Sequence, residues 1–587
     1  MKRGTPEAGI VRRFASKLGL GSAEPWLRSV GAALVLLLPA VSARAADAIW
    51  DGDTSGAWRL NSNWNAGYPN DWSHDATFDG PGNGNTSIDI SGNHVRVDRV
   101  FFRTADTAAY TFSGSHQLRV SRGISLDADV TNDQVFSLSV RPRTNRSTTY
   151  RNDSTSGVLK FTSQMTTDWE GSGVANLIFA GAGEIEANRI NDRDPAPGGN
   201  RTTSVEIDGP GTVTIYGNNN YSKGTRIDGG QLVARHDNAL GEGLVDLNGS
   251  ADGSYLTLDN NINVPNELDF GGTNGTTQNA TLRNLAGDNT WSGNLRLQMG
   301  GGRHYVEVDA GSLTIAGDVA QQNGTGGRSL DLGGPGDGEV SGAISNGTAD
   351  TFGVNKRGAG TWTLSSSANT YNGSTNVYEG TLLVNGTHTG GDTYTVASGA
   401  TLGGSGTVGG ATTISGHHTP GTSPGIQTFS SDLTYSGGAA DVTWELLKNT
   451  ATQESPAVFD QILVGGDLDF AGATTLNLSF DATGSTVDWT HNLWDSSQQW
   501  LLYGVTGTTA DLSSLSIVTV NWQDSIGALF DTVLSGSSFS LSQTDQDVYL
   551  NYAPGAATII PEPSTVLIWS LLAVLGITAG WYRGRKG

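Results

Sequence analysis

Short stretches of alternating apolar and polar residues recur along the chain, with glycine between them. In 213–215 (Val-Thr-Ile) and in 362–364 (Trp-Thr-Leu), a threonine separates two apolar side chains. Successive side chains of a strand point to opposite faces, so this period of two predicts strands with one buried face and one solvated face. Asparagine and glycine between the stretches are turn residues. The pattern therefore predicts an all-β body with almost no helix between residues 47 and 555.

One longer pattern occurs twice, at 209–233 and again at 358–383. Each copy predicts a strand, an asparagine-rich turn, a strand, a glycine turn and a further strand. Equivalent positions lie 150 residues apart: Thr225 and Thr375, Gly230 and Gly380, Leu232 and Leu382. A unit of this size cannot bury its own apolar face, so repetition predicts a stack of coils that share one core.

These two copies resemble the autotransporter-associated β-strand repeat of passenger domains. The resemblance is strongest over residues 339–427, and a weaker echo begins at Asp288. It implies a right-handed parallel β-helix, or β-solenoid. An autotransporter passenger is followed by a membrane barrel of alternating strands, whereas this sequence ends in a single apolar stretch. Export through a barrel of its own is therefore not expected.

Changes in residue pattern along the chain predict three segments within the exported body. Residues 46–80 hold Trp50, Trp58, Trp64 and Trp72, and we interpret them as an N-terminal cap, because the ends of a solenoid must be covered. The β-solenoid itself is expected over residues 81–425. Longer strand patterns over residues 426–554 predict a β-rich C-terminal domain.

The N-terminus has the layout of a secretory signal peptide. A basic region precedes an apolar run at 30–41, and small residues follow it. The predicted signal peptide is residues 1–45, with cleavage after Ala45 in a region formed by Ala43, Ala45 and Ala46. The alternative is a membrane anchor, but a bilayer span needs ~20 apolar residues and this run is shorter. Export by Sec-type machinery is expected.

The C-terminal segment, 555–587, predicts a transmembrane helix followed by a basic stop. The apolar stretch 565–582 is just long enough to cross a bilayer. The residues after it that would stay cytoplasmic are Arg583, Arg585 and Lys586. Immediately before the apolar stretch lies the motif Pro561, Glu562 and Pro563.

This order of Pro-Glu-Pro, apolar helix and basic tail resembles the PEP-CTERM sorting signal of Gram-negative bacteria. The resemblance covers the C-terminal end alone. It implies an exosortase-type membrane protease that cleaves near Pro-Glu-Pro, so that the protein is held briefly at the inner membrane and then reaches the cell surface or the medium. A permanent anchor that carries this motif by chance is the alternative.

Composition removes several classes of function. The chain of 587 residues has 82 glycines, no cysteine and a net charge of −23. Its N-terminal and C-terminal ends carry +5 and +3, which leaves −31 on the body. Such a body is repelled by phosphate backbones, so nucleic acid is not an expected partner. Disulfides and thiolate metal sites are excluded.

Few residues are candidates for chemistry. Asp192 and Asp194 could form the carboxylate pair of a glycosidase, but their Pro-Gly-rich loop favours a solvated turn. His236, and the adjacent His417 and His418 before Pro420, are expected to lie in turns and to be structural. Two adjacent histidines without a third ligand are weak evidence for metal.

Two loops leave structural calcium open. One begins at Asp51 and Asp53 but has Ser62 where a twelfth-position glutamate is required, and the other is a near match at 333–338. No catalytic residue, metal site or cofactor is predicted.

We therefore expect a structural protein, not an enzyme, of the cell envelope or extracellular matrix, associated with exopolysaccharide. One alternative is a polysaccharide-degrading β-helix enzyme, which needs two carboxylates converging in a groove. The other is a carbohydrate-binding adhesin, which would present coplanar exposed tryptophans from the segment 50–72.

Overall fold

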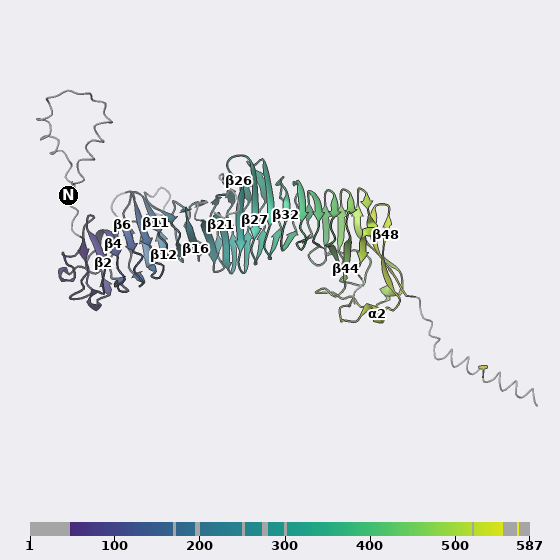
Figure 1. The fold of residues 1–587 in the computed structure, drawn as a ribbon, viewed down its shortest axis with the longest axis horizontal. Helices are drawn as coiled ribbons and strands as arrows, with labels where there is room; N and C mark the ends of the chain where they lie inside the picture. Colours follow the sequence, from purple (N-terminus) through teal and green to yellow (C-terminus); the bar gives the residue numbers. More distant parts are fainter. Residues whose placement is uncertain are drawn as a thin grey trace, which may run out of the picture.

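The protein is a parallel β-solenoid of the right-handed type, with about 15 turns. The computed structural model describes residues 47–167, 172–193, 200–248, 253–272, 280–298, 302–518, 522–555 and 572–573. Figure 1 shows a long rod, with the first coils at one end and β48 at the other. Described helix between residues 47 and 555 is limited to four short 3-10 turns and α2 (Phe530–Val533). The predicted all-β class is confirmed.

The first ladder of stacked strands runs from the N-terminus to the middle of the rod, and every neighbouring pair in it is parallel. Its strands are β1 (Ala48–Ile49), β2 (Asp75–Phe78), β4 (Val95–Phe102), β6 (Leu118–Leu126), β9 (Arg146–Asn152), β11 (Gly173–Ala180), β13 (Arg201–Asp208), β15 (Thr225–Ile227), β17 (Val245–Leu247), β20 (Leu268–Phe270), β23 (Leu295–Leu297), β26 (Val319–Gln321) and β29 (Ile344–Gly347).

The second ladder extends over nearly the whole rod and is also parallel throughout. It contains β3 (Ser87–Asp89), β5 (Thr111–Ser113), β7 (Gln134–Phe136), β10 (Leu159–Thr166), β12 (Glu184–Asn191), β14 (Thr212–Ile215), β16 (Gly230–Ala234), β18 (Ser254–Asp259), β21 (Ala280–Ala286), β24 (Arg303–Val308), β27 (Gly327–Gly333), β30 (Thr351–Lys356), β32 (Thr375–Val377), β34 (Thr393–Val396), β37 (Ala411–Ile414), β40 (Leu433–Tyr435), β43 (Leu468–Phe470) and β46 (Thr509–Ala510). The short β8 (Val140–Pro142) pairs with β6 and β10.

A third parallel ladder begins near the middle of the rod, with β19 (Asn263–Val264), β22 (Asp288–Trp291), β25 (Ser312–Ile315), β28 (Asp337–Val340), β31 (Thr361–Leu364), β33 (Thr381–Val384), β35 (Thr401–Gly404), β38 (His417–Pro420), β41 (Ala440–Glu445), β44 (Thr474–Ser479) and β47 (Leu515–Ile517). A last sheet contains β36 (Thr407–Val408), β39 (Ile426–Phe429), β42 (Gln461–Val464), β45 (Gln498–Val505), β49 (Asp547–Ala553) and β48 (Ser538–Thr544). Its final pairings, β45–β49 and β48–β49, are antiparallel.

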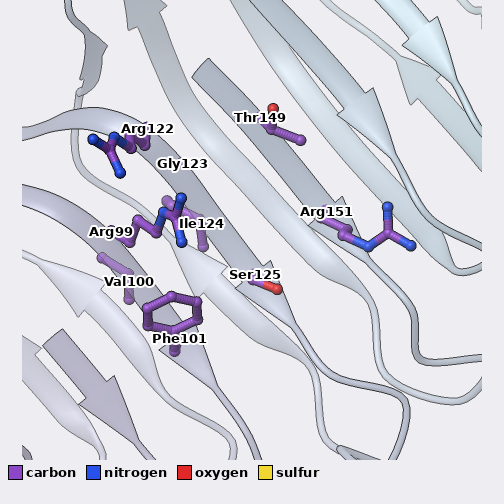
Figure 2. Close-up of a pocket in the computed structure, with 9 residues that line it drawn as sticks. All are labelled: Arg99, Val100, Phe101, Arg122, Gly123, Ile124, Ser125, Thr149 and Arg151. Carbon is purple, nitrogen blue, oxygen red and sulfur yellow. The ribbon is translucent and has the colours of Figure 1, made fainter. Parts of the chain in front are cut away.

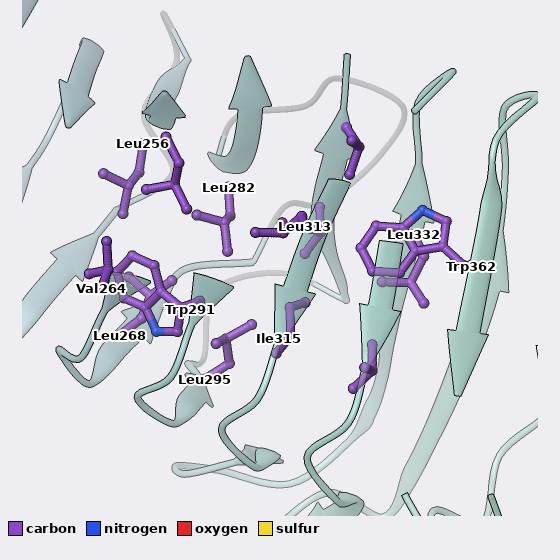
Figure 3. Close-up of a cluster of buried hydrophobic side chains, with 14 of the residues drawn as sticks. Leu256, Val264, Leu268, Leu282, Trp291, Leu295, Leu313, Ile315, Leu332 and Trp362 are labelled. Carbon is purple, nitrogen blue, oxygen red and sulfur yellow. The ribbon is translucent and has the colours of Figure 1, made fainter. Parts of the chain in front are cut away.

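Because the strands stack in register, like side chains from successive coils meet inside the rod. The rings of Phe112, Phe136 and Phe161 follow one another at centroid distances of 4.4 and 5.3 Å. In the middle coils, Val264 lies opposite Trp291, which lies opposite Ile315 (Figure 3). Such aligned apolar columns bury the face that the two-residue period predicted.

The two predicted repeat copies fold in the same way. The hydroxyl of Tyr221 lies 2.6 Å from that of Thr225, and the hydroxyl of Tyr371 lies 2.8 Å from that of Thr375. Gly230 and Gly380 both have a positive φ, 68° and 64°, at the corner before the last strand. A side chain at Gly230 would also place its Cβ 2.1 Å from the carbonyl oxygen of Gly209 on the neighbouring coil. Glycine at this corner therefore satisfies both the backbone conformation and the close approach of coils.

Parallel pairing continues past residue 426. Strand β40 pairs with both β37 and β43, and β41 pairs with both β38 and β44, so coils on either side of this position belong to the same ladders. The segment boundaries drawn from sequence texture stay predictions. Within the described residues no helix is both long and apolar enough to cross a bilayer, and the predicted span 565–582 falls outside them apart from Leu572 and Ala573.

Candidate functional site

The residues predicted to direct export lie outside the part of the chain that the structure describes. They are Ala43, Ala45 and Ala46 at the signal cleavage region, Pro561, Glu562 and Pro563 in the sorting motif, and Arg583, Arg585 and Lys586 in the basic stop. Their roles stay predictions.

Asp192 is buried, which corrects the expectation of a solvated turn. Its side chain accepts hydrogen bonds from the Thr203 amide at 2.6 Å, from the Ser222 hydroxyl at 2.6 Å and from the Ser222 amide at 3.1 Å. Burial raises the pKa of this carboxyl above its usual range, although those hydrogen bonds act in the opposite direction. Asp192 thus ties together three chain segments, and Asp194 lies outside the described residues.

The paired histidines lie in strand β38, not in a turn as expected. Because neighbours in a strand point to opposite faces, His417 is exposed and pairs with Asp441 at 2.6 Å, whereas His418 is fully buried. Nδ1 of His418 is 2.6 Å from the Tyr435 hydroxyl, and Nε2 is 2.8 Å from Oε1 of Gln427. The two rings cannot share one ligand.

His236 lies in a turn, as expected, where Nδ1 accepts a hydrogen bond from the Asn238 amide. Throughout the described residues, no three His, Cys, Asp or Glu side chains gather closely enough to hold a metal ion. The candidate calcium loop at Asp51 is instead held by amides, because Nδ2 of Asn83 donates to the Asp51 carbonyl and to Oδ1 of Asp53.

Three of the four tryptophans in the segment 50–72 are core residues. Trp50, Trp58 and Trp64 are at most 4% exposed and meet edge to face at centroid distances of 4.8–5.1 Å. The indole N–H of Trp58 donates to the Pro69 carbonyl at 3.0 Å. Trp72 is half-buried, and the Arg143 guanidinium lies 5.0 Å from its ring centroid. The segment does not present the row of coplanar exposed rings that a sugar-binding platform needs.

A small hollow of about 200 Å³ opens on the first ladder, and we call it the arginine hollow (Figure 2). It is lined by Arg99, Val100, Phe101, Arg122, Gly123, Ile124, Ser125, Thr149 and Arg151. Arg122 pairs with Asp98 at 3.5 Å and Arg151 with Asp153 at 2.6 Å. In the described part of the chain Arg99 has no carboxylate partner, and its guanidinium lies 5.9 Å from the Phe101 ring. One free guanidinium and two hydroxyls suit a small anion.

A much larger hollow of about 840 Å³ crosses the outer surface of the second ladder, and we call it the polar trough. It extends from the start of β24 over β27, β30 and β32 to the residues before β34. Five glycines line it: Gly302, Gly327, Gly353, Gly373 and Gly391. The side chains around them are Arg303, Arg328, Ser329, Thr351, Asn355, Asn372, Ser374, Asn376, Tyr378 and Asp392.

Sequence reasoning did not single out either hollow. Their side chains come from positions one coil apart in the sequence, which stacking places side by side. Asn355 and Asn376, for example, are register partners on β30 and β32. The sequence does show a polar residue between apolar ones in each strand. This pattern identifies side chains that point outward, but it does not show which outward side chains of other coils lie next to them.

Comparison with known protein families identifies a repeat in this chain. The passenger-associated transport repeat matches residues 208–234 and 354–384, which are the two repeat copies. No curated protein matches the chain. The matched segments cover a small part of the sequence, so they show a repeat in common with passenger proteins and suggest an exported passenger-like protein.

Proposed function

We propose that the protein is an exported structural rod of the cell surface or extracellular matrix, associated with exopolysaccharide. The observation that carries this proposal is the passenger-associated repeat, which matches two coils of a continuous solenoid. Each matched segment builds a strand, a turn and a further strand that bury the same Tyr–Thr contact. A stack of such coils forms a long, rigid, polar surface by repeating one short unit.

Delivery by a PEP-CTERM pathway is part of the proposal. The protein would pass through Sec-type machinery, be held at the inner membrane by residues 565–582, and be cut near Pro561–Pro563 by an exosortase-type protease. The support is the order of motif, apolar stretch and basic residues in the sequence.

A structural role is favoured over catalysis by the lining of the hollows. Cleavage of a glycosidic bond needs two carboxyl groups on either side of it. Among the described residues, the arginine hollow has no carboxylate in its lining, and the polar trough has Asp392 alone. The sequence suggested Asp192 as a candidate catalytic carboxylate. Both of its carboxylate oxygens accept hydrogen bonds from other chain segments.

Mass spectrometry of the mature protein in each cell fraction tests this proposal. We expect an N-terminus near Ala46, a C-terminus near Pro561–Pro563, and the protein in the surface or extracellular fraction. The paired change Glu562→Ala and Pro563→Ala should leave the protein at the inner membrane with its tail intact, because the extended cleavage segment is altered while the apolar stretch is kept. Recovery of the unprocessed chain in the cytoplasm would refute export, and normal processing of the variant would refute the sorting motif.

A further inference from the structure

The polar trough is kept open by its glycines. Gly353 is the register partner of Ser329, and a Cβ at Gly353 would lie 2.6 Å from the carbonyl oxygen of Ser374. At Gly327 a Cβ would lie 3.1 Å from the hydroxyl of Thr351. Side chains at these two positions would press against the neighbouring coil. Both glycines lie on strands, β27 and β30, where the missing side chain also allows a ligand to approach the backbone closely.

One wall of the trough is a fixed network of polar groups. Nδ2 of Asn376 donates to Oδ1 of Asn355 at 3.0 Å, and Nδ2 of Asn355 donates to Oδ1 of Asp331 at 2.7 Å. Arg357 Nε donates to Oδ2 of the same aspartate at 3.1 Å. These bonds hold both amides in one orientation, and among the described residues nothing donates to Oδ1 of Asn376. Asn376, a residue of the trough lining, therefore offers a positioned acceptor.

An aromatic ring stands beside this wall. Tyr378 is 43% exposed, and the guanidinium of Arg357 lies 4.2 Å from its ring centroid. The stacked arginine covers part of the ring and restricts its rotation, while the remainder lines the trough. A ring that is held in place beside amide groups offers an apolar surface and hydrogen bonds to the same ligand.

The chemistry of the trough excludes several kinds of occupant. Strands β24, β27, β30 and β32 are each paired on both sides, so no free edge is available to an added peptide strand. The body as a whole carries −31, which disfavours the approach of polyanions, and a charged oligosaccharide tests this against the lining arginines Arg303 and Arg328. Of the described residues in the lining, Tyr378 alone is aromatic, which is too little apolar surface for the core of a protein interface.

We propose that the polar trough binds a neutral polysaccharide chain that runs along the rod axis. The trough crosses five coils, and at a strand spacing of ~4.8 Å its length is about 19 Å, which accommodates several sugar rings. Sugar hydroxyls would meet Asn376, Arg303, Arg328 and Ser374, and the C–H face of one ring would pack on Tyr378. This inference deepens the proposed association with exopolysaccharide and rests on it only for the origin of the chain.

Calorimetry with defined oligosaccharides tests the site on the purified mature protein. The probes are neutral hexasaccharides of β-1,4-glucan, β-1,4-mannan and β-1,6-N-acetylglucosamine, with hexameric β-1,4-mannuronate as the charged comparison. We expect at least one neutral hexamer to bind, with an affinity that added salt leaves unchanged. Asn376→Ala and Tyr378→Ala should each weaken it about tenfold, because a positioned hydrogen bond or a packed ring is lost.

Matched controls are Tyr255→Ala and Thr413→Ala, which alter outward positions on the same ladder outside the trough. Both should bind as the parent does. The inference is overturned if no neutral hexamer binds, if the mannuronate alone binds, or if the trough variants match the controls. If the protein reaches the surface but binds no sugar, the sugar site is refuted and the proposed export and structural role remain. If the protein binds sugar but is not exported, the proposed function is refuted and the sugar site remains.

Discussion

At the residue scale, the buried histidines are neutral groups held by hydrogen bonds inside the coils. His418 is fully buried between Tyr435 and Gln427, and burial lowers its pKa to about 4. His304 is also fully buried, and burial lowers its pKa to about 4 as well. Charging either ring would place a cation in an apolar column, so each remains neutral in the folded rod.

The rod should lose stability as the pH falls from about 6.5 to 4. An unfolded histidine takes up a proton near pH 6.5 whereas folded His418 does so near 4, so in this window the unfolded state binds more protons and is favoured. The difference amounts to about 3 kcal/mol for this ring. Thermal melting at pH 7 and pH 4.5 measures it, with His418→Gln expected to show the smaller drop.

Buried carboxyls act in the opposite direction. Burial raises the pKa of Asp460 well above its usual range, so its contribution to stability grows as the pH falls through that raised pKa toward the ordinary value of an aspartate. Comparing His418→Gln with the parent at each pH removes this shared background. An equal drop in both proteins would show that His418 is not the group that titrates.

Asp192 gives a second residue-scale prediction. Asp192→Ala should lower the free energy of unfolding by about 1–3 kcal/mol, since the Thr203 amide and two Ser222 donors lose their acceptor. Denaturant unfolding followed by circular dichroism measures the change. Any polysaccharide-degrading activity of the sample should be unaffected by Asp192→Asn, and loss of such activity in a folded variant would restore the enzyme hypothesis.

At the element scale, each coil adapts to its neighbours. Trp362 is fully buried in β31, directly opposite Gly338 of β28, and its indole N–H donates to the Gly333 carbonyl at 3.2 Å. On the other side it faces Leu382. A Cβ at Gly338 would come within 2.6 Å of the tryptophan ring. The large ring thus fits because the preceding coil has no side chain at that position.

Gly338→Ala should therefore destabilise the rod by about 1–3 kcal/mol through overpacking. Trp362→Leu alone should also destabilise it, because the smaller side chain leaves a cavity. Together, the two changes should cost less than the sum of the single changes, since leucine makes room for the new methyl group. Unfolding free energies of the four proteins in this cycle measure the coupling, and strict additivity would contradict the proposed packing.

The sequence was sufficient to predict the strands but not to predict which residues of other coils lie beside them. The period of two identified β14 and β31, and the repeat spacing identified Gly230 and Gly380 as corners. The predictions that Asp192 is solvated and that His418 lies in a turn were wrong. Their partners Ser222 and Tyr435 lie 30 and 17 residues away and are brought near only by stacking. Contacts between coils depend on the length of each turn, which local pattern does not determine.

At the scale of the whole molecule, the solenoid must end without offering an open ladder. The second and third ladders end on β46 and β47, strands of two and three residues that have little backbone left to pair. The last parallel strand of the remaining sheet, β45, has eight residues. The hairpin β48–β49 pairs with it in the antiparallel sense, so the outermost strand of the sheet is β48, which carries polar side chains at all positions except Phe539 and Leu541.

Removal of this hairpin should convert the rod into an associating species. Deletion of residues 538–553 would leave the backbone groups of β45 unpaired and would uncover Trp494 and Trp500, which pack against Tyr552 and Phe539. An exposed edge of eight residues beside bare apolar rings is a template for pairing with another chain. Size-exclusion chromatography with light scattering should then show dimers or larger assemblies, whereas the control Thr544→Lys, an exposed change at the end of β48, should keep the mass of the parent. A deletion variant that stayed at the parent's oligomeric mass would show that the long edge is protected by something other than the hairpin.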